Sequence, residues 1–454
     1  MEDLIEQAAR ELCKPAGDSD MFASGEAILR NHAEFVLRCH ATWKKWHEEA
    51  VHQLLFHEGF LRRDKTHPVP GAKGFGEYNR AVWRRVNDTI VWSLLGAQRH
   101  RVKRLCLYRR RGDLSESNPD SAMAAVAEIN AHPMSIALWN DATSCVDIGD
   151  LTVIDDGLRP VPRFIELKEG TVNEAICAVL LKDEGSRDAA INEFKNRLGK
   201  NAAQQLNRVL RQKRIADQAL DLLIHEKGID PLSGHEIHVE ETAVEPTRYD
   251  ESLADLLQTA LVESKAIIEC VDGCLWIFAN ADPNLERERA AERFAQLLAE
   301  RLPGLSVPRL GQHPRWDRNR IRDLSAGVHY PMAMPLFLRK LPTSHIASLT
   351  YGRLMGNVLM YLDWNAFGQL IEKAGGVFAW GSKKDAGRAR AMNPHVRPPL
   401  VSGRLPQIHV DGAVGSITDP NIIEMFFDGV TPWSMAQNTV HEMRRFVKQH
   451  RHPD

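Results

Sequence analysis

The sequence predicts a chain of mixed α/β character, best described as α+β, in which a sheet is flanked by helices. Three observations support this: apolar residues recur at helical spacing over 77–108, residues 145–171 alternate as two strands around a turn, and residues 227–248 lose all clear periodicity. The 454 residues therefore divide into four segments. These are an N-terminal helical segment (1–68), a core (69–226), a linker (227–248) and a separate C-terminal α+β domain (249–454).

The composition is that of a soluble globular protein, with 43% hydrophobic and 26% charged residues. The net charge is −2, so any nucleic-acid surface must be a local patch. The seven cysteines are dispersed without a CxxC pair, which predicts free thiols in a reducing cytoplasm. The N-terminus has no apolar signal core, and no apolar run approaches a membrane span, so we expect a cytoplasmic protein with no membrane partner.

Residues 1–64 are predicted to be helical, and a loop rich in proline and glycine follows them. The helix predicted at 77–108 carries an apolar stripe that includes Val86 and Ile90. Asp88 lies beside this stripe, so its carboxylate should be partly buried and needs a cation or a metal as partner. Both readings stay open: a salt bridge to a neighbouring arginine, or a role in a catalytic site.

Basic residues gather in two places. A run of positive charge usually marks a solvated face. Two such runs on either side of the acidic residues of segment 145–171, described next, favour a phosphate-binding surface instead. The first cluster closes the helix at 77–108 and consists of Arg99, Arg101, Lys103, Arg104, Arg109, Arg110 and Arg111. The second lies in the helix predicted from 188 to about 225 and includes Lys200, Arg208 and Arg211.

Two predicted strands bring three charged side chains together. Asp150 belongs to the first strand, and Glu166 and Lys168 belong to the second. Because side chains alternate along a strand, Glu166 and Lys168 should share one face, while Ile165 and Leu167 face the core. A hairpin can place Asp150 beside them.

Two carboxylates and a lysine suit the hydrolysis of a phosphodiester. Mg²⁺, with Mn²⁺ as an alternative, takes oxygen ligands and usually only one or two protein carboxylates. Asp150 and Glu166 meet that demand, and the carbonyl of Leu167 offers a third oxygen. Lys168 would hold or help deprotonate the attacking water.

The order of these residues resembles the PD-(D/E)XK nuclease superfamily over roughly residues 77–215. The matching segments are IGDLTV, with Asp150, and FIELKEG, with Glu166 and Lys168. Gln205 is similar to the superfamily's helix glutamine, and Asp88 to its upstream acid. The resemblance implies a restriction-endonuclease-like mixed sheet flanked by helices, Mg²⁺-dependent cleavage of DNA, and 5′-phosphate products. The sequence leaves RNA open as a substrate.

Other readings compete with this one. Glu166 and Lys168 could form a polar strand edge with a cross-strand ion pair. The chain could also be a non-catalytic nucleic-acid-binding or assembly subunit, or a ligand-binding protein that uses tryptophans of its C-terminal half.

The C-terminal half carries no recognisable nucleic-acid reader. By analogy with nuclease fusions in bacterial defence against phage, we expect it to sense a trigger, bind a defence-system partner protein or form a homo-oligomer. Its predicted elements are a helix at 250–263, a hairpin around Asp272–Gly273, a helix beginning at Asp282–Pro283, helical sections at 333–340 and 345–373, a strand at 377–380 and a helix at 433–449.

Overall fold

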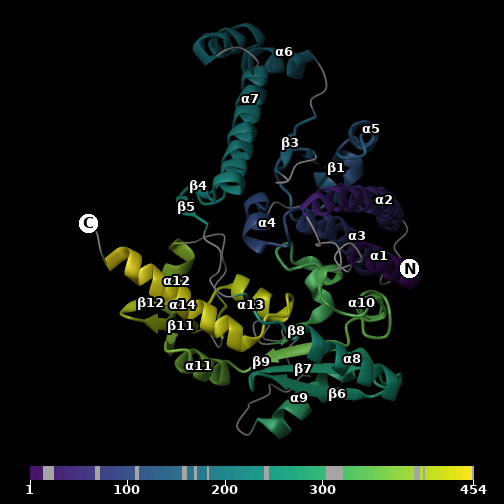
Figure 1. Cartoon of the computed structure of the whole chain (residues 1–454), viewed down its shortest axis with the longest axis vertical. Coiled ribbons are helices and arrows are strands. Elements are labelled where there is room, and N and C mark those ends of the chain that lie inside the picture. The colour runs from purple at the N-terminus through teal and green to yellow at the C-terminus, as the bar shows by residue number, and fades with distance from the viewer. Residues whose placement is uncertain are drawn as a thin grey trace. The chain divides into compact units, whose positions relative to one another are not determined.

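The computed structural model describes residues 1–13, 25–66, 72–107, 112–155, 161–167, 171–180, 184–239, 245–302, 321–392, 399–401 and 404–451. The chain forms two compact units (Figure 1). The core unit is Asp18–Glu240, and the C-terminal unit is Met1–Gly17 with Glu241–Asp454. Both combine helices with small sheets, so the protein is α+β.

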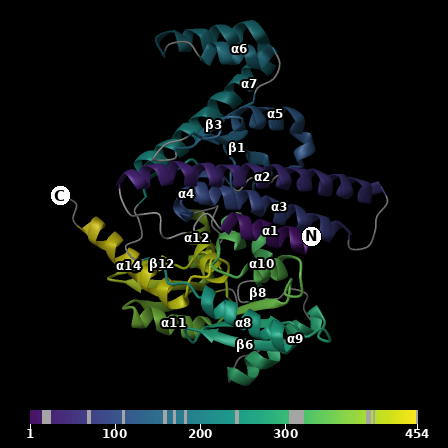
Figure 2. The ribbon, with the colours of Figure 1, turned by 45° about the vertical axis from the view of Figure 1, so that its right-hand side comes forward.

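This division differs from the predicted one at the N-terminus. Helix α1 (Glu2–Cys13) belongs to the C-terminal unit, where it packs against α10 (Thr343–Thr350). Helix α2 (Gly25–Thr66) instead runs alongside α3 (Ala72–Leu94) in the core unit (Figure 2). The buried side chains of Trp46 and other α2 residues explain this, because they need the apolar face of α3 to cover them.

Among its described residues, the core unit combines six α-helices with five short strands. Gly96 and Ala97 adopt left-handed conformations, φ 69° and 55°, and end α3 where one helix was predicted to continue to residue 108. Besides α2 and α3, the unit contains α4 (Arg99–Leu105), η2 (Leu114–Glu116), α5 (Pro119–Asn130), β1 (Ile136–Trp139), η3 (Asn140–Ala142), β2 (Leu151–Ile154), β3 (Arg163–Ile165), α6 (Thr171–Leu180), α7 (Glu184–His225), β4 (Lys227–Ile229) and β5 (Glu236–His238).

Strands β1, β2 and β3 form an antiparallel sheet in that order, in which Leu151 pairs with Trp139 on one side and Ile165 on the other. The resemblance implied a mixed sheet, but every pairing between described strands is antiparallel. The connections within this sheet explain the difference, because parallel neighbours need a crossover of about a dozen residues or more. The hairpin of β4 and β5 lies in the predicted linker but belongs to the core unit.

The C-terminal unit holds two antiparallel sheets, with strand orders β6-β7-β9-β8 and β10-β11-β12. Phe294 of α9 stacks on Phe278 of β7, which fixes that helix on the first sheet. The elements are α8 (Asp250–Glu263), β6 (Ala266–Val271), β7 (Leu275–Asn280), α9 (Arg287–Arg301), β8 (Ile321–Asp323), η4 (Leu324–His329), η5 (Leu336–Leu338), α10, β9 (Val358–Leu362), α11 (Trp364–Lys373), β10 (Val377–Gly381), α12 (Lys383–Met392), β11 (Leu405–Val410), β12 (Ala413–Ser416), α13 (Asp419–Phe426) and α14 (Pro432–Arg451).

Two predictions for the C-terminal half need correction. Strand β9 pairs with both β7 and β8 inside the stretch 345–373 that was predicted to be helical. Its five residues are all buried, and a short continuous apolar run does not distinguish a strand from a helix by periodicity. Helix α9 begins at Arg287 rather than at Pro283. The predicted turn is present, with Asp272 and Gly273 at φ 50° and 72°.

A buried histidine connects α2, α3 and β1. The Nε2 atom of His47 accepts the backbone N–H of Trp139 at 3.1 Å, so Nδ1 carries the proton and donates it to Oδ1 of Asn87 at 2.8 Å. The Asn87 amide in turn donates to the carbonyl of Ala142 at 2.9 Å. Burial lowers the pKa of His47 from 6.5 to about 4, although the bond to Asn87 opposes that shift.

We expect acid to destabilise the core unit through His47. Below pH 6.5 the unfolded chain binds a proton at this histidine that the folded chain binds only near pH 4. The free energy of unfolding should therefore fall by about 1.4 kcal/mol per pH unit across that window. Urea denaturation between pH 7 and pH 4 measures the slope, and His47→Gln should flatten it. An equal slope in both proteins would contradict the assignment.

Candidate active site

Asp150 and Glu166 lie next to each other at the ends of paired strands. Asp150 directly precedes β2, Glu166 directly follows β3, and the backbone N–H of Asp150 donates to the carbonyl of Ile165 at 2.8 Å. Gly149 makes this close approach possible. Its φ is +68°, and a Cβ atom there would lie 3.2 Å from the Ile165 carbonyl oxygen, so a side chain would be strained.

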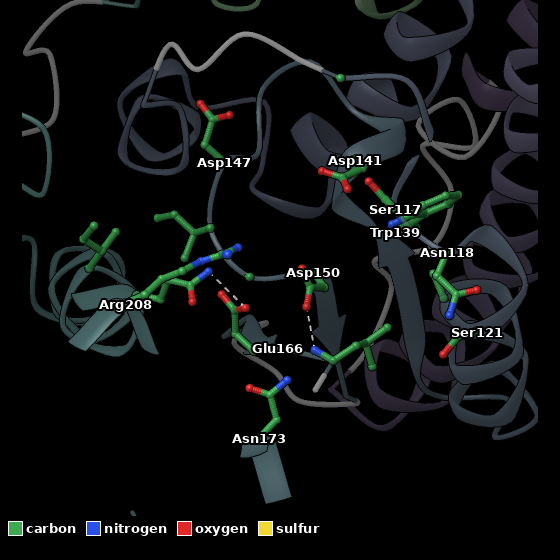
Figure 3. A pocket seen from close by; sticks show the side chains of 17 residues that line it. Ser117, Asn118, Ser121, Trp139, Asp141, Asp147, Asp150, Glu166, Asn173 and Arg208 are labelled. Carbon is green, nitrogen blue, oxygen red and sulfur yellow. Dashed lines mark hydrogen bonds between the residues drawn. The ribbon is translucent and has the colours of Figure 1, made fainter. Parts of the chain in front are cut away.

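Both carboxylates line one cavity of about 500 Å³ (Figure 3). An oxygen of Asp150 accepts the backbone N–H of Leu167 at 2.6 Å. An oxygen of Glu166 accepts the side-chain amide of Gln212, on α7, at 3.3 Å. The protein thus orients both acids, and Figure 3 shows them close together with Arg208 on the side of α7.

The strand carrying Glu166 is shorter than predicted. It ends at Ile165, so the alternation expected through Lys168 stops before Glu166. Leu167 was expected to face the core, yet it lines the same cavity as Glu166. Lys168 lies outside the described residues. Of the residues predicted to bind the metal or act beside it, the structure therefore brings Asp150, Glu166 and Leu167 together at one cavity.

The glutamine at the cavity is Gln212 rather than Gln205. The Gln205 amide donates to Asn173 of α6 at 3.2 Å, and Gln205 does not line the cavity. Gln212 is seven residues further along α7, two helical turns away on the same face. Sequence reasoning missed it because nothing in a uniform helical pattern indicates which turn reaches the strands.

On the Mg²⁺-dependent DNA cleavage that the sequence leads us to expect, Gln212→Ala should lower the cleavage rate about 10- to 100-fold, because residues that orient a metal ligand typically contribute that much. Gln205→Ala is the matched control, since it removes the same side chain from the same face of α7 and should leave the rate within about threefold of wild type. Initial rates on labelled DNA at saturating Mg²⁺ measure both. Equal losses in the two variants would contradict a role for the Gln212–Glu166 bond.

Asp88 is not brought to the cavity. Its carboxylate is fully buried and pairs with Arg85 at 2.7 Å. It also accepts the backbone N–H groups of Ser144 and Cys145, at 2.7 and 3.2 Å. These contacts fasten α3 to the segment leading to Asp150. They match the salt-bridge reading of the sequence.

Two further buried groups fix the other side of the cavity. Glu58 of α2 accepts the backbone N–H groups of Leu114 and Ser115, at 2.8 and 3.2 Å, and so holds η2. Arg84 of α3 donates to the backbone carbonyl of Asp141 in η3. Helices α2 and α3 thus hold η2 and η3 in place. Ser117, directly after η2, and Asp141, within η3, line the cavity.

The basic cluster of α4 is largely engaged within the core unit. Arg104 pairs with Asp230 at 2.9 Å, and Arg101 lies 3.7 Å from Glu226. Burial alone would raise the pKa of Asp230, but hydrogen bonds from Ser233 and the charge of Arg104 lower it overall. Arg99 and Lys103 lie on the same helix and also make interactions. Arg109, Arg110 and Arg111 lie outside the described residues.

Four basic residues of α7, Lys200, Arg208, Arg211 and Arg214, are arranged differently. Successive members are eight, three and three residues apart, so they follow one face of the helix. All are exposed, and no hydrogen bond or ion pair joins them to another described residue. Arg208 also lines the cavity. We call this set the α7 stripe; it consists of Lys200, Arg208, Arg211 and Arg214.

The donors around Asp150 and Glu166 fit a hard divalent cation. Mg²⁺ is usually held by one or two carboxylates and completes its shell with water. The Oε1 atom of Gln212 is buried and has no hydrogen-bond partner among the described residues, so it can accept a hydrogen bond from such a water. Within the described ranges, no group of three His, Cys, Asp or Glu side chains is arranged to hold a metal.

No protein-family model, curated protein sequence or solved structure matches this chain. Function must therefore be inferred from the residues of the cavity. In the part of the chain that the structure covers, no helix combines the length and apolar character needed to span a bilayer.

Proposed function

We propose that the chain is a metal-dependent nuclease with a restriction-endonuclease-like core, and that it hydrolyses phosphodiester bonds of DNA. One observation carries the proposal: Asp150 and Glu166, sixteen residues apart in sequence, line one cavity from neighbouring strand ends. The oxygen donors there suit Mg²⁺ or Mn²⁺. When bound, the cation would lower the pKa of a water and polarise the phosphoryl oxygen.

Each side chain at the cavity has a task in this proposal. Asp150 and Glu166 hold the cation, while Leu167 and Gln212 keep the two carboxylates oriented through their hydrogen bonds. Arg208 offsets the charge that builds on the phosphate. Lys168, which lies outside the described residues, is expected from the sequence to hold the attacking water.

The reaction needs only water as co-reactant. The water oxygen forms a bond to phosphorus, the bond between phosphorus and the leaving ester oxygen breaks, and that oxygen takes up a proton. A second proton passes to solvent, since the new phosphate is ionised at neutral pH. The cavity supplies both requirements of this step, namely carboxylates to hold the cation and a guanidinium to offset charge.

The test is an incubation of purified protein with plasmid and linear DNA in Mg²⁺, with and without EDTA. Cleavage that requires the metal and disappears in Glu166→Gln supports the proposal. Equal cleavage by wild type and Glu166→Gln overturns the site. Salt-sensitive DNA binding by both proteins, without cleavage in Mg²⁺ or Mn²⁺, would favour the non-catalytic binding subunit instead.

We expect the α7 stripe to bind the phosphate backbone. Arg211→Gln should weaken DNA binding about equally for unrelated sequences and lower the salt dependence of log Kd by about one. Arg101→Gln is the matched control: the Arg101 side chain lies beside Glu226, so its loss should change that slope far less. Fluorescence anisotropy across a salt series measures both. Equal changes in the two variants would contradict a separate role for α7.

A further inference from the structure

The start of α5 lines the cavity on the side opposite α7 (Figure 3). Asn118, its N-cap residue, makes no side-chain capping bond, and Pro119 has no N–H to donate. The first backbone hydrogen bond of the helix runs from Ala122 to the carbonyl of Asn118. The N–H groups of Asp120 and Ser121 therefore have no partner within the helix. Both donors and the positive end of the helix dipole are found on this side of the cavity.

Trp139 supplies an independent donor to the same side. It is 1% exposed but lines the cavity, and its backbone N–H is bound to His47. Its indole nitrogen makes no hydrogen bond to another described residue, and Figure 3 shows this nitrogen on the edge of the ring that faces the cavity. Because an indole N–H can only donate, the group that it meets in the cavity must be an acceptor.

Two hydroxyl groups complete this set of donors. Ser117 and Ser121 line the cavity, and their hydroxyls make no side-chain hydrogen bond to another described residue. Each hydroxyl can donate to a ligand. We call the set the α5 subsite; it consists of the side chains of Ser117, Ser121 and Trp139 with the N–H groups of Asp120 and Ser121.

Positive charge lies behind the α5 subsite. Arg84 of α3 is 5% exposed and donates to the backbone carbonyls of Asp141 and Gly112, both of which line the cavity. Its guanidinium offsets the carboxylate of Asp141. The α5 subsite therefore presents donors, a helix N-terminus and a neighbouring guanidinium, which together suit an anion.

We propose that the α5 subsite binds a second phosphate group of the substrate strand, while the scissile phosphate lies at Asp150 and Glu166. This inference rests on the proposed nuclease function. Phosphate is the anionic group of a nucleic acid, and the two carboxylates and the α5 subsite line one cavity. Its volume of about 500 Å³ suits a single small molecule, such as one nucleotide. Holding two phosphates fixes the register of the strand without reading its bases.

The first experiment detects phosphate at the indole of Trp139 and needs no cleavage. The chain has ten tryptophans, and the Trp139 signal in a ¹H–¹⁵N correlation spectrum is the indole signal missing from Trp139→Phe. We expect this signal to shift and saturate as inorganic phosphate is added in EDTA, whereas potassium chloride of equal ionic strength leaves it unchanged. A Trp139 signal that phosphate does not shift overturns the inference. A shift in a protein that cleaves no DNA would keep the subsite and remove the nuclease.

The second experiment tests the α5 subsite during cleavage in Mg²⁺. Single phosphates on either side of the scissile bond are replaced by uncharged methylphosphonates, and 5′-phosphate ends are compared with 5′-hydroxyl ends. We expect one such change to slow wild type at least about tenfold, because hydrogen bonds to a charged group are the strong ones. The sensitive position identifies the second phosphate as an internal diester or a terminal monoester. The same change should slow Trp139→Phe by less than about threefold.

Trp92→Phe is the matched control. Trp92 is also buried in the core unit, and its indole nitrogen has no partner among the described residues, but it does not line the cavity. This variant should keep the wild-type sensitivity. If circular dichroism shows that Trp139→Phe does not fold, Ser121→Ala takes its place, since Ser121 is only partly buried. Equal sensitivity of wild type and the subsite variant overturns the inference and leaves the nuclease proposal standing.

Discussion

Asp150→Asn should lower metal-dependent cleavage by at least about 10³-fold while leaving the fold intact. The substitution keeps the size of the side chain and an oxygen that can still accept the N–H of Leu167. It removes the charge that would attract the cation in the proposed site, and a single electrostatic contact of this kind is worth about 10²–10³ even without a metal. Single-turnover rates at saturating DNA, over a range of Mg²⁺ concentrations, measure the loss.

The matched control is Asp155→Asn, at the other end of β2. Asp155 is exposed, forms an ion pair with Arg163 and does not line the cavity. The Asp155→Asn protein should therefore cleave DNA at the wild-type rate. A rate for Asp150→Asn within about tenfold of Asp155→Asn would remove Asp150 from the metal site. Recovery at high Mn²⁺ would support it, because a weakened site can be filled by a metal that binds more tightly.

The two acids could be predicted because the strand pattern around them is local. Apolar residues flanking Asp150 and Glu166 indicate strands, and a turn between them indicates a hairpin. The turn of α7 that meets them could not be predicted. Every turn of a long helix repeats the same spacing, so choosing Gln212 over Gln205 requires knowing where the helix crosses the sheet.

The two basic clusters show a second feature that could not be predicted from the sequence, namely which of them is paired with acids. In the sequence both are dense runs of arginine and lysine. The acids that pair with Arg101 and Arg104 are Glu226, at the end of α7, and Asp230, which lies in the segment predicted to be a linker. Composition therefore could not separate a paired cluster from an exposed one. The hydroxyl and amide side chains that line the cavity left no recognisable pattern, because such residues are common in loops.

Asp88→Ala should destabilise the core unit by about 3–5 kcal/mol, measured by urea denaturation. The change leaves the nearly buried guanidinium of Arg85 without its partner at 2.7 Å. It also leaves the backbone N–H groups of Ser144 and Cys145 without their acceptor, and an unsatisfied buried donor costs about 1–3 kcal/mol. Asp120→Ala, an exposed acid on α5, should change stability by less than about 0.5 kcal/mol.

Two further measurements separate a structural Asp88 from a catalytic one. Adding Arg85→Met to Asp88→Ala should recover about 1–2 kcal/mol, because it removes the unpaired buried charge but leaves the N–H groups unsatisfied. Cleavage per folded molecule should then fall by less than about tenfold, whereas Asp150→Asn loses its activity while folded. A stably folded Asp88→Ala protein that does not cleave DNA would instead indicate a catalytic role for Asp88. The ion pair with Arg85 and the bonds to the 144–145 backbone predict the opposite result: Asp88 acts on cleavage only by holding the segment that leads to Asp150.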